Sequence, residues 1–323
     1  MNQLTMGNGD GSGVGAAVSA AIAEPPREKL TKKAITADHP TWCPGCGDFA
    51  VLASFYKVLE KRNLEHEKIV TLAGIGCSSR FPYFVNGHGA HFIHGRAVPL
   101  ASGISLARPD LHVFLFGGDG DGFSIGGNHL DHGARKNINM TYFIMDNFVY
   151  GLTKKQTSPI GFKSKTDPTG AIDQPVNPMK KLVAGGATFI ARTHAANVAH
   201  MMQMIERAFD HQGFSVIECL SECVEFFPDV FDPANPKKGG SFEVIQEKKW
   251  DNTPEDELRH DVTDEVAAYK LATLPFPGVF GVFYETDRPT KNSLEKKWIE
   301  NTREKLGNPS DLEVLQKTFD RIK

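Results

Sequence analysis

The sequence predicts an α/β fold: a doubly wound, mainly parallel sheet with helices on both faces, followed by a helix-rich C-terminal extension. Two observations lead to this prediction. Short apolar runs alternate with amphipathic segments of helical period along most of the chain. The apolar runs are also nearly continuous, which is typical of parallel strands whose two faces are both covered.

The expected elements follow one another in regular order. Asp48 is the expected N-cap of the first amphipathic helix, and Pro109 is expected to stop the second. We expect helices at residues 49–63, 98–107, 125–136 and 198–211. We expect strands at residues 68–74, 111–116, 140–145, 187–193, 214–220 and 278–284.

Composition divides the chain into three expected parts. Residues 1–40 begin with a Gly- and Ala-rich stretch without the basic region of a secretory signal, so we expect a flexible or partner-contacting arm. Residues 41–228 carry the regular alternation and form the expected main domain. Residues 229–323 begin with Pro-, Gly- and Lys-rich text and are expected to be a linker and extension.

The overall composition excludes several classes of protein. The net charge of −3 gives no basic excess for binding nucleic acid. The sequence has no apolar run near the roughly 20 residues needed to span a bilayer, so we expect no membrane segment. Five cysteines without a secretory signal indicate a reducing cytoplasm, and metal binding rather than disulfides.

Four loops carry unusual residues, and each follows or flanks an expected element. Ligands of doubly wound sheets bind at the carboxyl ends of the strands, where such loops meet. We therefore expect one site built from the four loops, which are WCPGCGD (42–48), GIGCSSRF (74–81), GGDGDGFSIGG (117–127) and MDNFVYGLTKKQ (145–156).

The third loop has the glycines of a phosphate-binding turn, yet it also carries two aspartates. A divalent cation bridging the ligand's phosphates resolves this conflict, because such cations prefer carboxylate, amide and carbonyl oxygens. Asp119, the Asn147 side chain and the Val149 carbonyl are the expected Mg²⁺ ligands. The alternative is that both loops are ordinary Asp/Asn/Gly turns. The strand, helix and second strand around them favour the cation.

The cysteines indicate a metal centre. Cys43 and Cys46 form a CxxC turn, Cys77 lies in the second loop, and Cys219 and Cys223 end an expected strand. Four thiolates from three loops suit either an iron–sulfur cluster or a structural zinc ion, and spacing alone does not separate the two. A thioredoxin-like couple is disfavoured because no apolar strand precedes the CxxC turn.

These motifs together resemble a known family. The text WCPGCGD…GIGCSSRFPYF…HGRAVPLASGISLARPD…GDGDGFSIGGNHL…DNFVYGLTKKQTSP is similar to the beta subunit of 2-oxoacid:ferredoxin oxidoreductases, above all the 2-oxoglutarate type. The likeness covers about 41–232. Lys155 stands where the family usually has Gly.

The resemblance implies a thiamine-diphosphate-binding domain of the pyrophosphate type, with Gly118-Asp119-Gly120 and Asn147 as its motif. It also implies a 4Fe–4S cluster on Cys43, Cys46, Cys77 and Cys223, leaving Cys219 as a buried thiol. Arg80 and Lys154 are the expected cations for a dicarboxylate substrate. The expected cofactor contacts are Ile75, Gly76, Cys77, Ser78, His94, Gly95, Gly120, Asp121, Gly151, Leu152 and Thr153.

The implied reaction is oxidative decarboxylation of a 2-oxoacid to its acyl-CoA, with electrons passed to ferredoxin, or the reverse carboxylation. The activating glutamate belongs to the partner alpha subunit in this family, and no residue of this chain is assigned that role. We therefore expect an alpha2-beta2 assembly. The alternatives are a pyruvate-type or broad-range enzyme, a non-oxidative thiamine-dependent lyase, and an iron–sulfur electron-transfer subunit.

Overall fold

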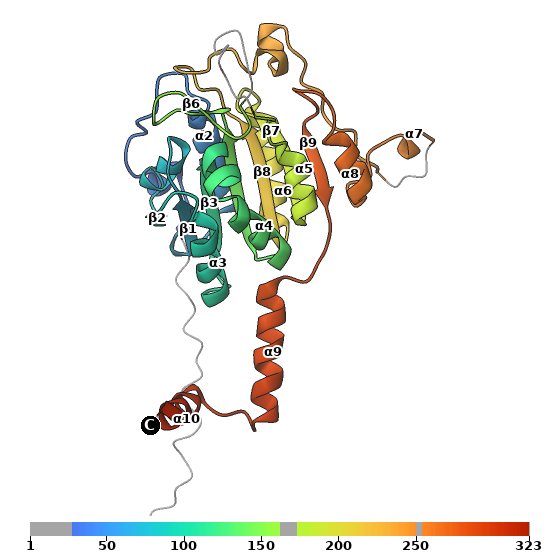
Figure 1. The fold of residues 1–323 in the computed structure, drawn as a ribbon. Helices are drawn as coiled ribbons and strands as arrows, with labels where there is room; N and C mark the ends of the chain where they lie inside the picture. The colour runs from blue at the N-terminus through green and yellow to red at the C-terminus, as the bar shows by residue number, and fades with distance from the viewer. Residues whose placement is uncertain (1–27, 162–172, 250–253, 323) are drawn as a thin grey trace, which may run out of the picture.

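The computed structural model describes residues 28–161, 173–249 and 254–322. Its centre is a seven-stranded sheet in the order β2-β1-β3-β4-β8-β7-β9 (Figure 1). Neighbouring strands are parallel throughout, except that the edge strand β9 runs antiparallel to β7. The strands are β1 (Ile69–Ala73), β2 (His88–His91), β3 (His112–Gly118), β4 (Met140–Asp146), β7 (Phe189–His194), β8 (Phe214–Leu220) and β9 (Gly281–Glu285).

Helices cover both faces of the sheet, which confirms the predicted doubly wound α/β fold (Figure 1). One apolar core lies under α2 (Asp48–Arg62) and α6 (Val198–Asp210). The other lies under α3 (Ala97–Ala107), α4 (Gly127–Lys136), α5 (Pro178–Gly185) and α8 (Glu265–Leu271). None of the helices within the described ranges is long and apolar enough to cross a membrane.

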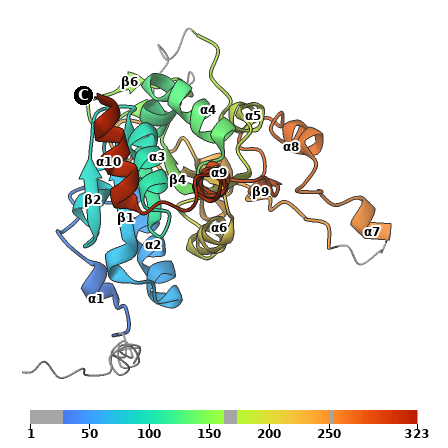
Figure 2. The same cartoon turned by 90° about the horizontal axis from the view of Figure 1, so that it is seen from below.

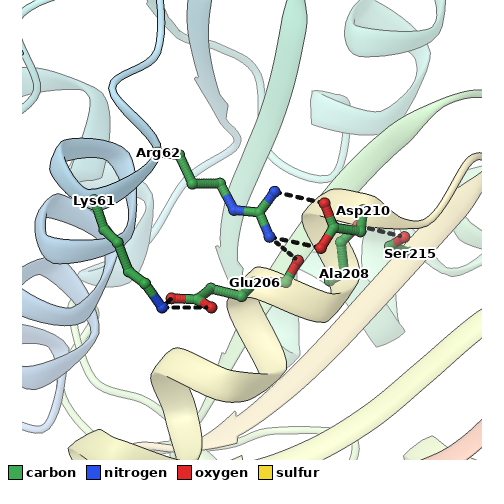
Figure 3. Close-up of polar contacts among 6 residues, drawn as sticks. All are labelled: Lys61, Arg62, Glu206, Ala208, Asp210 and Ser215. Atoms are coloured by element: carbon green, nitrogen blue, oxygen red, sulfur yellow. Dashed lines mark hydrogen bonds and ion pairs between the residues drawn. The ribbon is translucent and has the colours of Figure 1, made fainter.

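The helices α2 and α6 lie side by side and are joined by ion pairs (Figure 3). The Arg62 guanidinium donates to both carboxylate oxygens of Asp210, at 2.5 and 2.6 Å. The Lys61 ammonium lies 2.7 Å from a Glu206 carboxylate oxygen. These contacts hold the C-terminal end of α2 against α6. The N-terminal end of α2 follows directly after the CxxC loop.

Strand register brings the predicted loops to one edge of the sheet. Gly118 of β3 pairs with Met145 of β4, and Asp146 pairs with Leu220 of β8. Because the three strands are parallel, the residues that follow them leave the sheet at the same edge. This is the upper edge of the sheet in Figure 1.

Residues 28–40, which the sequence predicts as part of a flexible or partner-contacting arm, pack on the main domain. Leu30 and Ile35 are buried in the core under α2, and the short helix α1 (Lys32–Ile35) separates them. Thr36 forms an antiparallel bridge with Val85. Two large apolar side chains anchor this segment on the main domain; the rest of the predicted arm, residues 1–27, lies outside the described residues.

The predicted boundary at residue 228 does not separate the extension from the sheet. Phe231, Ile245 and Phe280 are buried in the main core, and β9 pairs with β7. Beyond β9, α9 (Lys291–Lys305) and α10 (Asp311–Ile322) extend below the body (Figure 1), and α9 is seen end-on from below (Figure 2). The short helix α7 (Pro254–Glu257) lies before β9 in the chain.

Three local features of the structure differ from the sequence predictions. Asp48 is not an N-cap: Gly47 holds that position, and Asp48 lies buried inside the first turn of α2. The helix expected at 125–136 begins earlier as a π-helix, Gly120–Ile125, and continues as α4. The short strand β2 was not predicted, because its sequence HGAH has no alternating apolar pattern.

Candidate cofactor and metal site

A cavity lies at the carboxyl edge of the sheet, among the loops that follow β1, β3 and β4. It contains the predicted cofactor contacts apart from Gly95, together with all three predicted Mg²⁺ ligands. Gly118 and Tyr150 also line it, and neither was predicted as a contact. The lining residues are Ile75, Gly76, Cys77, Ser78, His94, Gly118, Asp119, Gly120, Asp121, Asn147, Val149, Tyr150, Gly151, Leu152 and Thr153.

Asp119 has the environment of a cation ligand. Its side chain is 1% exposed, and Oδ2 has no hydrogen-bond partner within the described part of the chain. Burial raises the pKa of the Asp119 carboxyl to about 6, although the Ser158 hydroxyl and the backbone N–H groups of Gly120 and Asn147 act against this rise. A cation beside this oxygen would remove the penalty on the charged form, so the donor set fits Mg²⁺.

The amide side chain of Asn147 lies at the same place. Its Oδ1 accepts a hydrogen bond of 3.1 Å from the Val149 N–H, which folds the loop back toward the cavity. This turn puts the side chain of Asn147 and the backbone of Val149 on one short segment of the cavity wall. An amide oxygen and a carbonyl oxygen are suitable partners for a carboxylate around a hard cation.

Asp121 has a different environment, although it lies two residues from Asp119. Its Oδ1 accepts hydrogen bonds from the backbone N–H of Ile75 at 3.0 Å and of Gly95 at 2.8 Å. The Nδ1 of His94 lies 2.5 Å from the same oxygen. Asp121 therefore joins the loop after β3 to the loop after β1 and to the His94 loop.

Two glycines are required by close packing in this cavity. A Cβ on Gly74 would lie 2.2 Å from Oδ1 of Asp121, which would displace the carboxylate from its three partners. A Cβ on Gly120 would lie 2.1 Å from the ring of Tyr150. The glycines of the motif therefore make room for neighbouring side chains as well as for a ligand.

The two cations predicted to bind substrate, Arg80 and Lys154, do not line the cavity. Arg80 is half-buried in the 3₁₀-helix Ser78–Tyr83, where its charge acts weakly against the burial that raises the pKa of the Cys77 thiol. Lys154 is exposed in the turn between β5 (Val149–Tyr150) and β6 (Gln156–Thr157).

The next residue in this turn, Lys155, has a φ of 79°, a left-handed conformation that glycine adopts most easily. The turn is closed by a hydrogen bond of 3.1 Å from the Lys155 N–H to the Tyr150 carbonyl. The unusual lysine therefore keeps the backbone shape of a glycine turn.

Four of the five cysteines gather next to the cavity. The sulfurs of Cys223 and Cys77 lie 3.5 and 3.7 Å from where a Cβ would stand on Gly151, a cavity residue. Burial first, and then the charges of Asp48, Cys223 and Cys77, raise the pKa of the Cys46 thiol well above its usual range. Burial raises the pKa of Cys77 to about 11, and the charges of Asp48, Cys223 and Cys43 add to the effect.

This mutual influence fits a metal centre. Thiolates are the ligand form of cysteine, and burial and neighbouring negative charge both oppose the formation of a thiolate at Cys46 and Cys77. A bound cationic centre would reverse that balance, which is why clustered cysteines without disulfides are typical of metal sites. The four residues are those predicted as cluster ligands: Cys43, Cys46, Cys77 and Cys223.

Cys219 lies apart from the other four. It is buried in β8, and its sulfur lies 4.0 Å from the sulfur of Met201 on α6. Burial raises the pKa of this thiol well above its usual range, and no other cysteine contributes to the rise. Cys219 has the environment of an ordinary core thiol.

Sequence reasoning missed several residues of the site. Tyr150 stands one residue from two predicted contacts, so its position was a usable signal. Ser158, directly after β6, lies close enough to Asp119 to act against the burial that raises the pKa of its carboxyl, and nothing in the sequence indicates this proximity.

Comparisons with known proteins agree with this site. Residues 74–219 match the family described as thiamine pyrophosphate enzyme, C-terminal TPP binding domain. The chain is 43% identical over 208 residues to the 2-oxoglutarate oxidoreductase subunit KorB of Mycobacterium tuberculosis, covering 64% of this chain and 56% of that relative. It is 36% identical over 280 residues to the 2-oxoacid:ferredoxin oxidoreductase 1, subunit beta, of Aeropyrum pernix, covering 85% and 87%.

One solved structure extends this likeness to three dimensions. It is the 2-oxoglutarate:ferredoxin oxidoreductase from Magnetococcus marinus, with 2-oxoglutarate, coenzyme A and succinyl-CoA bound. The TM-score is 0.75 at 36% identity, and the match covers 91% of this chain and 97% of that one.

Proposed function

This chain belongs to the beta-subunit family of the 2-oxoacid:ferredoxin oxidoreductases, and from this premise we propose that it binds thiamine diphosphate, Mg²⁺ and a 4Fe–4S cluster. The proposed reaction converts a 2-oxoacid and coenzyme A to the acyl-CoA and carbon dioxide, with two electrons passing to ferredoxin. The same site would serve the reverse carboxylation. The free cysteines suit the reducing cytoplasm that we propose as its location.

One observation carries the proposal: the buried carboxylate of Asp119 and the clustered cysteines meet at one cavity. Gly151 lines the cavity beside Asn147 and faces the sulfurs of Cys77 and Cys223. A lyase that uses thiamine diphosphate without redox chemistry has no need of the cysteines. An electron carrier has no need of the buried aspartate.

The chain's own residues would hold the cofactors in defined ways. Asp119, Asn147 and the Val149 carbonyl would hold the cation and, through it, the diphosphate. Asp121 keeps His94 at the cavity wall, so an imidazole N–H or nitrogen is held ready for the cofactor. When bound, thiamine diphosphate supplies an electron sink for the loss of carbon dioxide, and the cluster takes up electrons one at a time.

We propose 2-oxoglutarate as the preferred substrate. Arg80 and Lys154 bring two positive charges to the loops around the cavity, and neither lies within the cavity itself. That position suits the distal carboxylate of a dicarboxylic 2-oxoacid better than pyruvate, which has no second carboxylate. The Magnetococcus marinus relative with 2-oxoglutarate bound supports this choice.

We further propose that an alpha subunit completes the site in an alpha2-beta2 assembly. The cavity encloses about 90 Å³, far less than the roughly 300 Å³ or more of a typical ligand pocket. Residues 41–228 would hold most of the cofactor contacts, and the N-terminal arm and the C-terminal helices α9 and α10 would contact the partner. Exposed apolar residues on α10, such as Leu312 and Phe319, support contact between the C-terminal helices and the partner.

Partner dependence is testable with the purified chain. With thiamine diphosphate, Mg²⁺ and cluster loaded, the isolated chain should release little carbon dioxide from 2-oxoglutarate, because the activating glutamate lies on the partner. Adding the alpha subunit should restore CoA-dependent reduction of ferredoxin. Release by the isolated chain at the rate of the complex would contradict the proposal, and pyruvate as the better substrate would contradict its substrate assignment.

A further inference from the structure

The four clustered cysteines come from three loops that are distant in sequence, so their geometry depends on contacts between the loops. Asp48 is placed to make these contacts. It lies two residues after Cys46, in the first turn of α2, and its side chain is only 2% exposed. Its backbone N–H lies close enough to Cys46 to act against the burial that raises the pKa of that thiol.

The Asp48 side chain reaches the loop that carries Cys223. The Ser221 hydroxyl donates a hydrogen bond of 2.6 Å to Asp48 Oδ1, across 173 residues of sequence. Ser221 stands two residues before Cys223, directly after β8. A hydrogen bond to a buried carboxylate is among the stronger hydrogen bonds in proteins, so this contact fixes the start of the Cys223 loop.

The same carboxylate also faces the loop that carries Cys77. The hydroxyl of Ser78, the residue after Cys77, lies close enough to lower the pKa of Asp48, while burial raises it. Asp48 therefore stands at the meeting point of all three cysteine loops. Ser78 is itself buried, so water does not screen the interaction.

Two further contacts join the loops around this carboxylate. The indole N–H of Trp42, beside Cys43, donates a hydrogen bond of 2.7 Å to the carbonyl of Cys77. The Gly47 N–H donates to the Glu222 carbonyl at 3.4 Å, and a Cβ on Gly47 would lie 2.6 Å from the Ser221 hydroxyl. The close approach of Gly47 is what allows the bond between Asp48 and Ser221.

Stability of the fold alone does not explain a carboxylate at this place. Asp48 Oδ2 is buried and has no hydrogen-bond partner within the described ranges. An unpartnered carboxylate oxygen destabilises a protein interior, and an apolar side chain of similar size would avoid that cost. The cysteine loops explain the Asp48 carboxylate, because a polar group at this place can interact with hydroxyls from more than one loop.

We propose that Asp48 is a positioning residue that holds the three cysteine loops together, through its hydrogen bond to Ser221 and its place beside Ser78, in the geometry of the bound cluster. This inference rests on the proposed assignment of the cluster to Cys43, Cys46, Cys77 and Cys223. Asp48 acts through the loops and is not itself a ligand. Ser221 is its principal partner, so the two side chains form one functional unit.

The test uses the complete complex, reconstituted with iron and sulfide. Asp48→Ala and Ser221→Ala should each speed iron release to a chelator by roughly tenfold or more, as expected when a strong buried hydrogen bond is lost. Each variant should also change the electron paramagnetic resonance spectrum of the reduced cluster. The double variant should release iron no faster than Asp48→Ala, because both changes break one contact.

Two matched controls separate this effect from general loss of stability. Ser54→Ala removes a buried hydroxyl from α2, and Ser215→Ala removes one from β8; neither side chain contacts a cysteine loop. Both controls should release iron at the wild-type rate. A wild-type rate and spectrum in Ser221→Ala, which is the milder of the two tests, would overturn the role of Asp48. A wild-type complex without iron would instead overturn the cluster assignment itself.

Discussion

Replacing Cys77 by alanine should abolish the reduction of ferredoxin while leaving thiamine diphosphate bound. Cys77 is the one cysteine of the four that also lines the cofactor cavity, and it directly follows the turn after β1. Burial, and after it the negative charges nearby, raise the pKa of its thiol, and a cationic centre would oppose both effects. Removing one ligand of four should cost the cluster, and with it the path for single electrons.

Cys219→Ala is the matched control, because its thiol is buried against Met201 and lies apart from the other cysteines. That variant should keep its iron and its activity and lose only a little stability. Electron transfer should be followed with ferredoxin or methyl viologen, and bound thiamine diphosphate should be measured separately. Reduction at the wild-type rate by Cys77→Ala would show that the cluster assignment is wrong.

Replacing Asp119 by alanine should lower the affinity for Mg²⁺ and for thiamine diphosphate together. Asp119 and Asp121 each have a buried, unpartnered carboxylate oxygen in the cavity, but the other oxygen of Asp121 already accepts from the Ile75 and Gly95 N–H groups. We therefore assign to Asp119 the full negative charge that faces the cation. Loss of residues that merely support a metal ligand weakens binding by about 10- to 100-fold, so loss of the ligand should reach at least that range. Asn147→Ala should act in the same direction and less strongly.

Asp121→Ala is the informative comparison, because Asp121 lies in the same motif and is equally buried. Its Oδ1 accepts bonds from Ile75 and Gly95, so the variant should loosen the His94 loop rather than remove a cation ligand. The affinity for Mg²⁺ should be measured by titration at saturating thiamine diphosphate, and the affinity for thiamine diphosphate by titration at saturating Mg²⁺. Equal losses of Mg²⁺ affinity in Asp119→Ala and Asp121→Ala would contradict the roles given to the two aspartates.

The position of the site could be predicted from the sequence because it depends on local patterns. The apolar runs before Asp119 and Asn147 mark β3 and β4 as buried neighbours, and parallel strands put the residues that follow them at one edge. The same reasoning placed the loop with Cys77. These predictions required no knowledge of which distant residues touch.

The parts that could not be predicted depend on long-range contacts or on weak local signals. An aspartate before an amphipathic helix resembles an N-cap, and only its partner Ser221, 173 residues away, reveals that Asp48 is buried. The strand β9 looks like part of a separate extension until it pairs with β7. The strand β2 contains histidine and glycine, so it lacks the apolar pattern by which strands are recognised.

Metal and cofactor analysis of the purified complex tests the central claim most directly. The chain, prepared without oxygen together with its alpha subunit, should contain about four iron atoms, bound thiamine diphosphate and Mg²⁺. Asp119→Ala should then lose the thiamine diphosphate and keep the iron, whereas Cys77→Ala should do the opposite. Thiamine diphosphate without iron in the wild-type complex would contradict the account and indicate a lyase. Iron without thiamine diphosphate would contradict it equally and indicate an electron carrier.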